Sequence, residues 1–269
     1  MPVEPSPPPL DGRYELLSEL GRGGVGVVWR ARDQRLRRDV AVKQIRIPGT
    51  VAEREQVLGR LMREGRAAAR LNHPSVTTVY DVAVDGDSAY LIMELVSAPS
   101  LRDLVDGSGP LEPRRAAVIG LQLLGALEVA HRAGIVHRDV KPSNVMVPTE
   151  GPAKLADFGI AAVADDVTLT ATGLVLGSPA YMAPEQASAG GSGATVDLWG
   201  LGATLFFAVE GAPPFDRGQP LATLAAVVHE APPEPRQAGA LAPVIAALLV
   251  KDPDQRADIA ATRELLQQA

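Results

Sequence analysis

The chain lacks cysteine altogether, which excludes disulfide bonds, thiolate metal sites and control by thiol oxidation. It also lacks an excess of positive charge. Its 26 lysines and arginines are outnumbered by 32 aspartates and glutamates, which gives a formal charge of -6 over 269 residues. Because no basic run provides the positive surface that attracts a phosphate backbone, we expect no nucleic-acid partner.

Long apolar runs are absent as well, since none reaches the ~20 residues that a membrane-spanning helix needs. The longest stretches cover residues 116–130, 198–209 and 238–250, and breaks by glutamine, proline or glycine make them typical of buried core helices. The first ten residues hold five prolines and no apolar signal segment, so residues 1–11 are predicted to form a disordered leader. We therefore expect a cytoplasmic location and no membrane segment within this chain.

The apolar pattern predicts a strand-rich first part and a helical second part. Short β-type runs occur at residues 14–20, 25–30, 40–45, 77–84 and 89–95. One helix interrupts them at residues 51–71, where Thr50 and Glu53 have capping-box spacing. A long helical pattern follows at residues 114–133.

These elements predict an α+β fold with two lobes. The small lobe would be an antiparallel sheet with one helix at residues 12–95, followed by a hinge at 96–99 and a larger, mainly helical lobe at 100–269. A cleft between two such lobes is the expected place for a ligand.

A glycine-rich hairpin and a lysine in a strand are the first candidate phosphate ligands. Gly21, Gly23 and Gly26 form a G-x-G-x-x-G pattern whose missing Cβ atoms let backbone amides approach phosphates, although a plain turn has the same composition. Lys43 is one of only four lysines against twenty-two arginines and lies in a predicted apolar strand. If buried it needs an anionic neighbour, and the alternative is a lysine that reaches solvent from an edge strand.

Two polar segments follow the long predicted helix. The first runs from His137 to Asn144, and the second is Asp157-Phe158-Gly159. The carboxamide of Asn144 and the carboxylate of Asp157 are oxygen ligands of the kind that Mg²⁺ prefers, although each segment alone could be a surface turn.

The order and spacing of these motifs resemble the eukaryotic-type protein kinases, most closely bacterial serine/threonine kinases of actinobacterial receptor type. The likeness runs from Tyr14 to about Leu266 and includes Ala183-Pro184-Glu185 and a distal arginine. It implies the bilobal protein kinase fold and transfer of the γ-phosphate of ATP to protein serines and threonines, with Mg²⁺ or Mn²⁺ as the metal. It also implies homodimers formed through the small lobe, and leaves open a soluble enzyme or the cytoplasmic domain of a membrane-anchored receptor.

The resemblance assigns catalytic and metal-binding roles by position. Lys43 would hold the α- and β-phosphates and pair with a helix glutamate, for which we expect Glu64 over Glu53 and Glu55. Asp139 would orient the proton of the substrate hydroxyl, and Lys141, typical of serine/threonine enzymes, would neutralise charge on the transferred group. Asn144 and Asp157 would hold the metal. The expected nucleotide contacts are Gly21, Gly23, Gly26, Val28, Ala41, Lys43, Met93, Glu94, Val96 and Met146.

Regulatory roles are implied in the same way. Arg138, next to Asp139, implies a basic pocket that a phosphorylated activation loop satisfies, and Thr170 and Thr172 are the expected autophosphorylation sites. Ser178 stands where threonine is usual and keeps a hydroxyl for the catalytic aspartate and lysine. Gly59 and Gly65 each cost ~1 kcal/mol of helix propensity, which predicts a mobile helix and unliganded states with Lys43 and Glu64 apart.

Structural roles complete the set. Glu185 and Arg256 would form a buried ion pair, and Asp197 would hold the backbone of the catalytic loop. Gly200 stands where a serine often follows the tryptophan, Trp199, and we expect this departure to lie outside the chemistry.

Two other functions remain open. A pseudokinase would share the fold, but it usually loses one of Lys43, Asp139 and Asp157, and all three are present. A phosphotransferase for small molecules usually lacks Ala183-Pro184-Glu185 and a loop with threonines, and both are present here.

Overall fold

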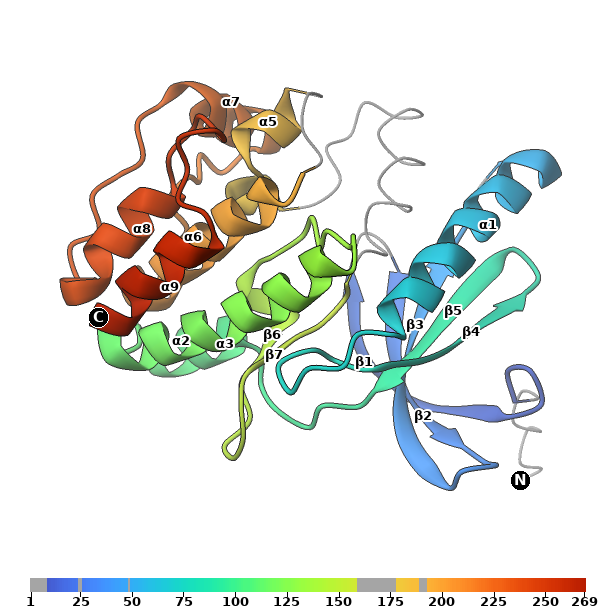
Figure 1. The fold of residues 1–269 in the computed structure, drawn as a ribbon. Helices are drawn as coiled ribbons and strands as arrows, with labels where there is room; N and C mark the ends of the chain where they lie inside the picture. The colour runs from blue at the N-terminus through green and yellow to red at the C-terminus, as the bar shows by residue number, and fades with distance from the viewer. Residues whose placement is uncertain (1–8, 24–25, 48, 159–177, 189–192) are drawn as a thin grey trace.

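A five-stranded antiparallel sheet with one helix is followed by a larger helical part, as the fold class predicted (Figure 1). The computed structural model describes residues 9–23, 26–47, 49–158, 178–188 and 193–269. The strands of the sheet are β1 (Tyr14–Gly23), β2 (Gly26–Asp33), β3 (Arg38–Arg46), β4 (Val79–Asp85) and β5 (Ser88–Glu94), in the spatial order β1-β2-β3-β5-β4.

The alternation of side chains along β3 gives the sheet two apolar faces. Val40 and Val42 belong to a small cluster on one face, which also contains the buried Tyr14. Ala41 and Ile45 point to the other face and join the main core of the protein. Because side chains alternate along a strand, this register also brings Lys43 to the same face as Ala41, next to the main core.

The only helix of the small lobe within the described residues, α1 (Val51–Ala68), begins at the predicted capping box. The backbone amide of Glu53 donates to the Thr50 hydroxyl at 3.4 Å, and the Thr50 amide donates to the Glu53 carboxylate at 2.7 Å. The helix packs its buried face, which includes Gly65, against β4. A Cβ on Gly65 would lie 2.6 Å from a methyl group of Val82, so this glycine permits close packing of the helix on the sheet.

The second part of the chain is built around one almost completely buried helix, α6 (Thr195–Glu210). Its helices are α2 (Leu101–Ser108), α3 (Pro113–Arg132), α5 (Pro184–Ala187), α6 (Thr195–Glu210), α7 (Pro220–His229), α8 (Ala242–Leu248) and α9 (Ile259–Gln268). Every residue of α6 from Val196 to Val209 is buried, as in a central core helix, and both α3 and α8 pack on it. Within the described residues, no helix combines the length and the apolar character needed to cross a bilayer.

A short hairpin lies between the sheet and the helices (Figure 1). It consists of β6 (Val145–Met146) and β7 (Lys154–Leu155), and its strands come directly after the first polar segment and directly before the second. The predicted hinge at residues 96–99 falls between the end of β5 and the start of α2. The boundaries proposed for the two lobes stay predictions.

The two glycines of α1 provide a matched pair for a stability test. Gly59 is exposed with no heavy atom within 4 Å of its ideal Cβ position, whereas Gly65 is buried against Val82. We expect Gly59→Ala to raise the free energy of unfolding by roughly 0.5–1 kcal/mol, and Gly65→Ala to lower it by about 1–3 kcal/mol through overpacking. Urea denaturation of both variants measures this, and adding Val82→Ala should rescue Gly65→Ala. Equal effects of the two substitutions would contradict the packing role of Gly65.

Candidate active site

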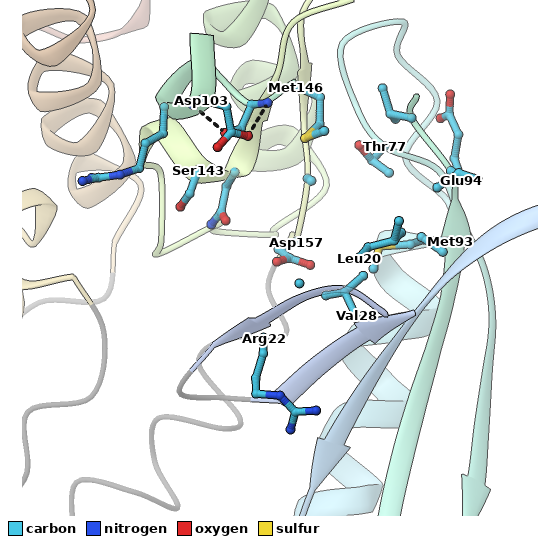
Figure 2. A pocket seen from close by; sticks show the side chains of 18 residues that line it. Leu20, Arg22, Val28, Thr77, Met93, Glu94, Asp103, Ser143, Met146 and Asp157 are labelled. Carbon is cyan, nitrogen blue, oxygen red and sulfur yellow. Dashed lines mark hydrogen bonds between the residues drawn. The ribbon is translucent and has the colours of Figure 1, made fainter. Parts of the chain in front are cut away.

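A cavity of about 490 Å³ lies between the sheet and the helical part (Figure 2). Val28 and Met93 face it from the sheet, and Met146 from the β6–β7 hairpin faces it from the other side. The lining includes these expected contacts: Gly21, Val28, Ala41, Met93, Glu94, Val96, Asn144, Met146 and Asp157. The cavity is therefore an apolar slot that opens toward polar groups.

The glycines of the hairpin have different surroundings. Gly21 has open space at its ideal Cβ position. Gly23 and Gly26 pair with each other at the end of the β1–β2 hairpin. A Cβ on Gly26 would lie 1.9 Å from the carbonyl oxygen of Gln44, so glycine is required there by the approach of β2 to β3, whatever ligand the hairpin covers.

Lys43 forms an ion pair with Asp157, although the two residues are 114 positions apart. The Nζ–Oδ2 distance is 2.8 Å, and the side chains are only 12% and 19% exposed. Burial raises the pKa of the Asp157 carboxyl. The Lys43 ammonium, with smaller contributions from His137 and Lys141, lowers this pKa by more than burial raises it, so the pKa lies below its ordinary value. The expected pairing of Lys43 with Glu64 stays a prediction.

The loop from His137 to Asn144 brings three of the expected residues together. The Asp139 carboxylate accepts from Lys141 Nζ at 2.7 Å and from the Asn144 amide at 3.0 Å. The same amide nitrogen donates to the Asp139 backbone carbonyl at 2.8 Å. Asn144 gives its amide hydrogens to Asp139, no hydrogen bond between described residues engages its Oδ1, and both Asn144 and Asp157 line the cavity.

The backbone of this loop is held by Asp197, in the first turn of α6. Its carboxylate accepts from the backbone amides of His137 at 2.8 Å and Arg138 at 2.7 Å. Arg138 has a φ of +66°, a left-handed conformation that costs on the order of 1–3 kcal/mol in a residue other than glycine. Asp197 therefore stabilises a strained turn immediately before Asp139.

Two histidines that the sequence did not assign also support the loop. His131 on α3 lies 2.7 Å from the Asp197 carboxylate and is 9% exposed. The His137 ring accepts from the Asp139 amide through Nδ1 at 3.2 Å, so Nε2 carries the proton and donates to the Ala156 carbonyl at 2.8 Å. This ring therefore connects the loop of Asp139 to the strand end that carries Asp157.

Glu185 and Arg256 form a two-pronged ion pair with N–O distances of 2.6 and 3.0 Å. The Arg256 side chain is completely buried and also donates to the carbonyls of Val250 at 2.9 Å and Thr195 at 2.7 Å. Because every hydrogen-bonding side of the guanidinium is engaged, the pair joins α5 firmly to the loop before α9.

Gly200 lies directly against the loop of Asp139, and the expectation that it takes no part in the chemistry stays a prediction. A Cβ at this position would be 2.8 Å from the Val140 carbonyl oxygen and 2.9 Å from the Val140 Cβ. The glycine therefore allows α6 to approach the backbone of the residue after Asp139.

The expected regulatory residues are only partly described. Thr170 and Thr172 lie outside the described residues. The Nε of Arg138 is buried and has no hydrogen-bond partner in the described part of the chain. Asp139 has Lys141 and Asn144 as side-chain partners, and a contact of the Ser178 hydroxyl with Asp139 or Lys141 stays a prediction.

Comparison with known proteins adds independent information. A family model described as a protein kinase domain matches residues 14–268. Serine/threonine-protein kinase PknB of Mycobacterium leprae is 41% identical over 266 residues, which cover 95% of this chain and 42% of that protein. A probable serine/threonine-protein kinase of Streptomyces coelicolor is 40% identical over 258 residues, with 92% and 38% covered.

A third relative extends the range of similarity. Serine/threonine-protein kinase PknL of Mycobacterium tuberculosis is 39% identical over 206 residues, which cover 77% of this chain and 51% of that protein. The chain thus spans about two fifths to one half of the length of these relatives.

A double-mutant cycle tests whether Glu185 and Arg256 act as a unit. We expect Glu185→Gln and Arg256→Met each to lower the free energy of unfolding by about 3–5 kcal/mol, because each leaves a buried charge without its partner. In the double variant, the free energy of unfolding measured by urea denaturation should fall by clearly less than the sum of the two single losses. Additive losses, within about 0.5 kcal/mol, would show that the two side chains are not coupled.

Proposed function

Because the chain belongs to the protein kinase family, we propose that it transfers the γ-phosphate of ATP to serine and threonine hydroxyls of proteins. The observation that carries this proposal is the convergence of Lys43, Asp157, Asn144 and Asp139 at one end of the apolar cavity. The relatives named serine/threonine-protein kinases support the same substrate class.

The apolar slot suits a purine base. Val28 and Ala41 on the sheet side and Met146 on the other side would sandwich a flat ring, with the hinge backbone at Glu94 and Val96 along its edge. With the base in this position, the phosphates of the nucleotide would lie toward Gly21 and Asp157.

The residues present fit the divalent metal that the family uses with ATP. We assign the metal to Asp157 and Asn144, which offer an ionised carboxylate and a free amide oxygen, and we expect Mg²⁺ because it binds through few protein oxygens together with phosphate. When bound, the metal neutralises charge on the phosphate oxygens. The Lys43 ammonium would then give up its ion pair with Asp157 and bind the α- and β-phosphates and Glu64.

Asp139 acts on the acceptor hydroxyl. Its carboxylate orients that hydroxyl and accepts its proton at Oδ2 or Oδ1, while Lys141, 2.7 Å away, places a positive charge beside the transferred group. The positions of both side chains depend on Asn144 and on the backbone that Asp197 holds. Catalysis would come from positioning and charge stabilisation, with no covalent role for the protein.

Phosphorylation of the chain itself is part of the proposal. A phosphate on Thr170 or Thr172 would give the Arg138 guanidinium, whose buried Nε has no hydrogen-bond partner in the described part of the chain, an anionic partner. The cytoplasmic location predicted from the sequence stays a prediction.

A transfer assay with labelled ATP tests the proposed reaction. We expect the purified chain with Mg²⁺ to phosphorylate a generic protein substrate on serine and threonine, and Asp139→Asn to lose at least about 100-fold in rate because the acceptor hydroxyl loses its proton acceptor. Mass mapping of the same wild-type reactions should find phosphate on Thr170 and Thr172.

The control for this assay is Asp103→Asn, since Asp103 lines the outer part of the cavity and takes no part in the proposed transfer. Transfer to protein that survives in Asp139→Asn, or nucleotide binding without any transfer in the wild type, would refute the function. Nucleotide binding without transfer would indicate a pseudokinase. Transfer to small molecules alone would indicate a small-molecule phosphotransferase.

Association through the small lobe is the remaining proposal. Leu36, in the β2–β3 turn, is 59% exposed and flanked by the exposed Arg35 and Arg37. Nearby, Arg13 donates to Asp33 at 2.7 Å, and this hydrogen bond is the main reason that the pKa of Asp33 falls to about 2. In a symmetric dimer the same exposed turn, with Leu36 at its tip, would be used by both copies.

Sedimentation velocity tests this dimer. We expect a concentration-dependent dimer for the wild type and a monomer for Leu36→Glu, which places a charge in the apolar contact. Leu221→Glu, at a position 71% exposed on α7, is the control and should still dimerise. A monomeric wild type, or a dimeric Leu36→Glu variant, would contradict the proposal.

A further inference from the structure

The side chain of Thr77 places a buried hydroxyl in the wall of the cavity (Figure 2). Thr77 is 5% exposed, and its Oγ1 has no hydrogen-bond partner among the residues that the structure describes. A buried hydroxyl without a partner costs stability, because nothing compensates for the loss of its hydrogen bonds to water. Such a group at a ligand cavity indicates a bond that forms with a ligand.

The other buried polar side chains of the lining are already engaged. Glu94 pairs with Lys154 at 2.8 Å, and Ser100 donates to Asp103 at 2.6 Å. Asn144 and Asp157 have the partners described above. Among the buried side-chain nitrogen and oxygen atoms of the described lining, Thr77 Oγ1 is the one that has no hydrogen-bond partner.

The backbone around Thr77 is fixed on both sides. The Thr77 amide donates to the Leu155 carbonyl at 3.0 Å, which places this residue beside β7 and the adjoining Ala156. The next residue, Thr78, exchanges bonds with Glu94: the Glu94 amide donates to the Thr78 carbonyl at 2.8 Å, and the Thr78 amide donates to the Glu94 carboxylate at 3.2 Å. The hydroxyl is thus held at the hinge end of the cavity, next to the end of β5.

The hinge end is where the base would lie, because the phosphate-handling groups occupy the other end. Lys43, Asp157 and Asn144 define that other end, whereas Met93, Glu94 and Thr77 lie along the sheet and hinge. A hydroxyl can both donate and accept, so it can bind an exocyclic amine or a ring nitrogen of a purine.

We propose that Thr77 Oγ1 hydrogen-bonds the polar C6–N7 edge of the purine base and so contributes to the choice of nucleotide. The inference rests on the proposed function, since it places the base of ATP in this cavity. It adds a side-chain contact to the base, whereas the hinge recognises the base through backbone groups. The hydroxyl destabilises the free protein and stabilises the complex.

Calorimetric binding of nucleoside diphosphates tests the contact without phosphoryl transfer. The probes are ADP, the diphosphate of purine riboside, which lacks the 6-amino group, and 7-deaza-ADP, which lacks N7, each with Mg²⁺. Thr77→Val removes the hydroxyl at nearly constant shape, and we expect it to weaken ADP binding about three- to tenfold, the usual effect of one hydrogen bond. For the probe that lacks the bonded atom, the wild type and Thr77→Val should bind equally.

Two further variants control for packing. Thr78→Val makes the same chemical change one residue along, at a position that does not line the cavity, and should bind all probes as the wild type does. Thr77→Ser keeps the hydroxyl and should keep the discrimination between ADP and the probe that lacks the bonded atom. The assignment would be overturned if Thr77→Ser lost the discrimination between ADP and this probe. It would also be overturned if Thr78→Val reduced that discrimination as much as Thr77→Val does.

Thermal unfolding provides a second readout that does not depend on activity. Without nucleotide, Thr77→Val should melt at a higher temperature than the wild type, because an unsatisfied buried hydroxyl is gone, while the stabilisation by saturating ADP should shrink. A lower melting temperature, or an equal loss of affinity for all three diphosphates, would overturn the inference alone. A wild type that binds no diphosphate would overturn the proposed function as well.

Discussion

The carboxylate of Asp197 is the group on which the geometry of the site depends. It is buried at the start of the central helix and accepts hydrogen bonds from two consecutive amides of the loop that carries Asp139. Those amides belong to a turn in which Arg138 is left-handed, a conformation that does not persist unless the surroundings determine it. A buried anion with several hydrogen bonds satisfies this requirement, and a mobile surface residue would not.

Further polar contacts connect Asp197 and the loop of Asp139 to the rest of the molecule. His131 connects the same carboxylate to α3, and His137 connects the loop to the strand end before Asp157. On the far side, Asp157 carries the ion pair with Lys43 that joins the helical part to the sheet. The groups that would handle a phosphate thus come from segments far apart in the sequence, and buried polar contacts hold them together.

Much of this arrangement was predictable from sequence, because it depends on local pattern or on motif order. Alternating residues predicted the strands, and Thr50 with Glu53 predicted the start of α1. The contacts that were missed depend on what a residue meets in space. His131 is a single histidine without a spacing signal, and the close neighbours of Gly65 and Gly200 come from other elements. The distance of 2.8 Å between Lys43 and Asp157 likewise emerges only from the packing of the two lobes, and the pairing of Lys43 with Glu64 stays a prediction.

The central claim is that Asp197 holds the loop of Asp139 in its strained conformation. Amide hydrogen exchange of the Asp197→Asn variant tests it most directly, since the new amide nitrogen cannot accept a hydrogen bond. At least one of the amides of His137 and Arg138 should then exchange roughly tenfold faster or more, the factor that corresponds to ~1.4 kcal/mol, while amides in the core of α6 keep their wild-type rates. Unchanged exchange at both loop amides would contradict the claim.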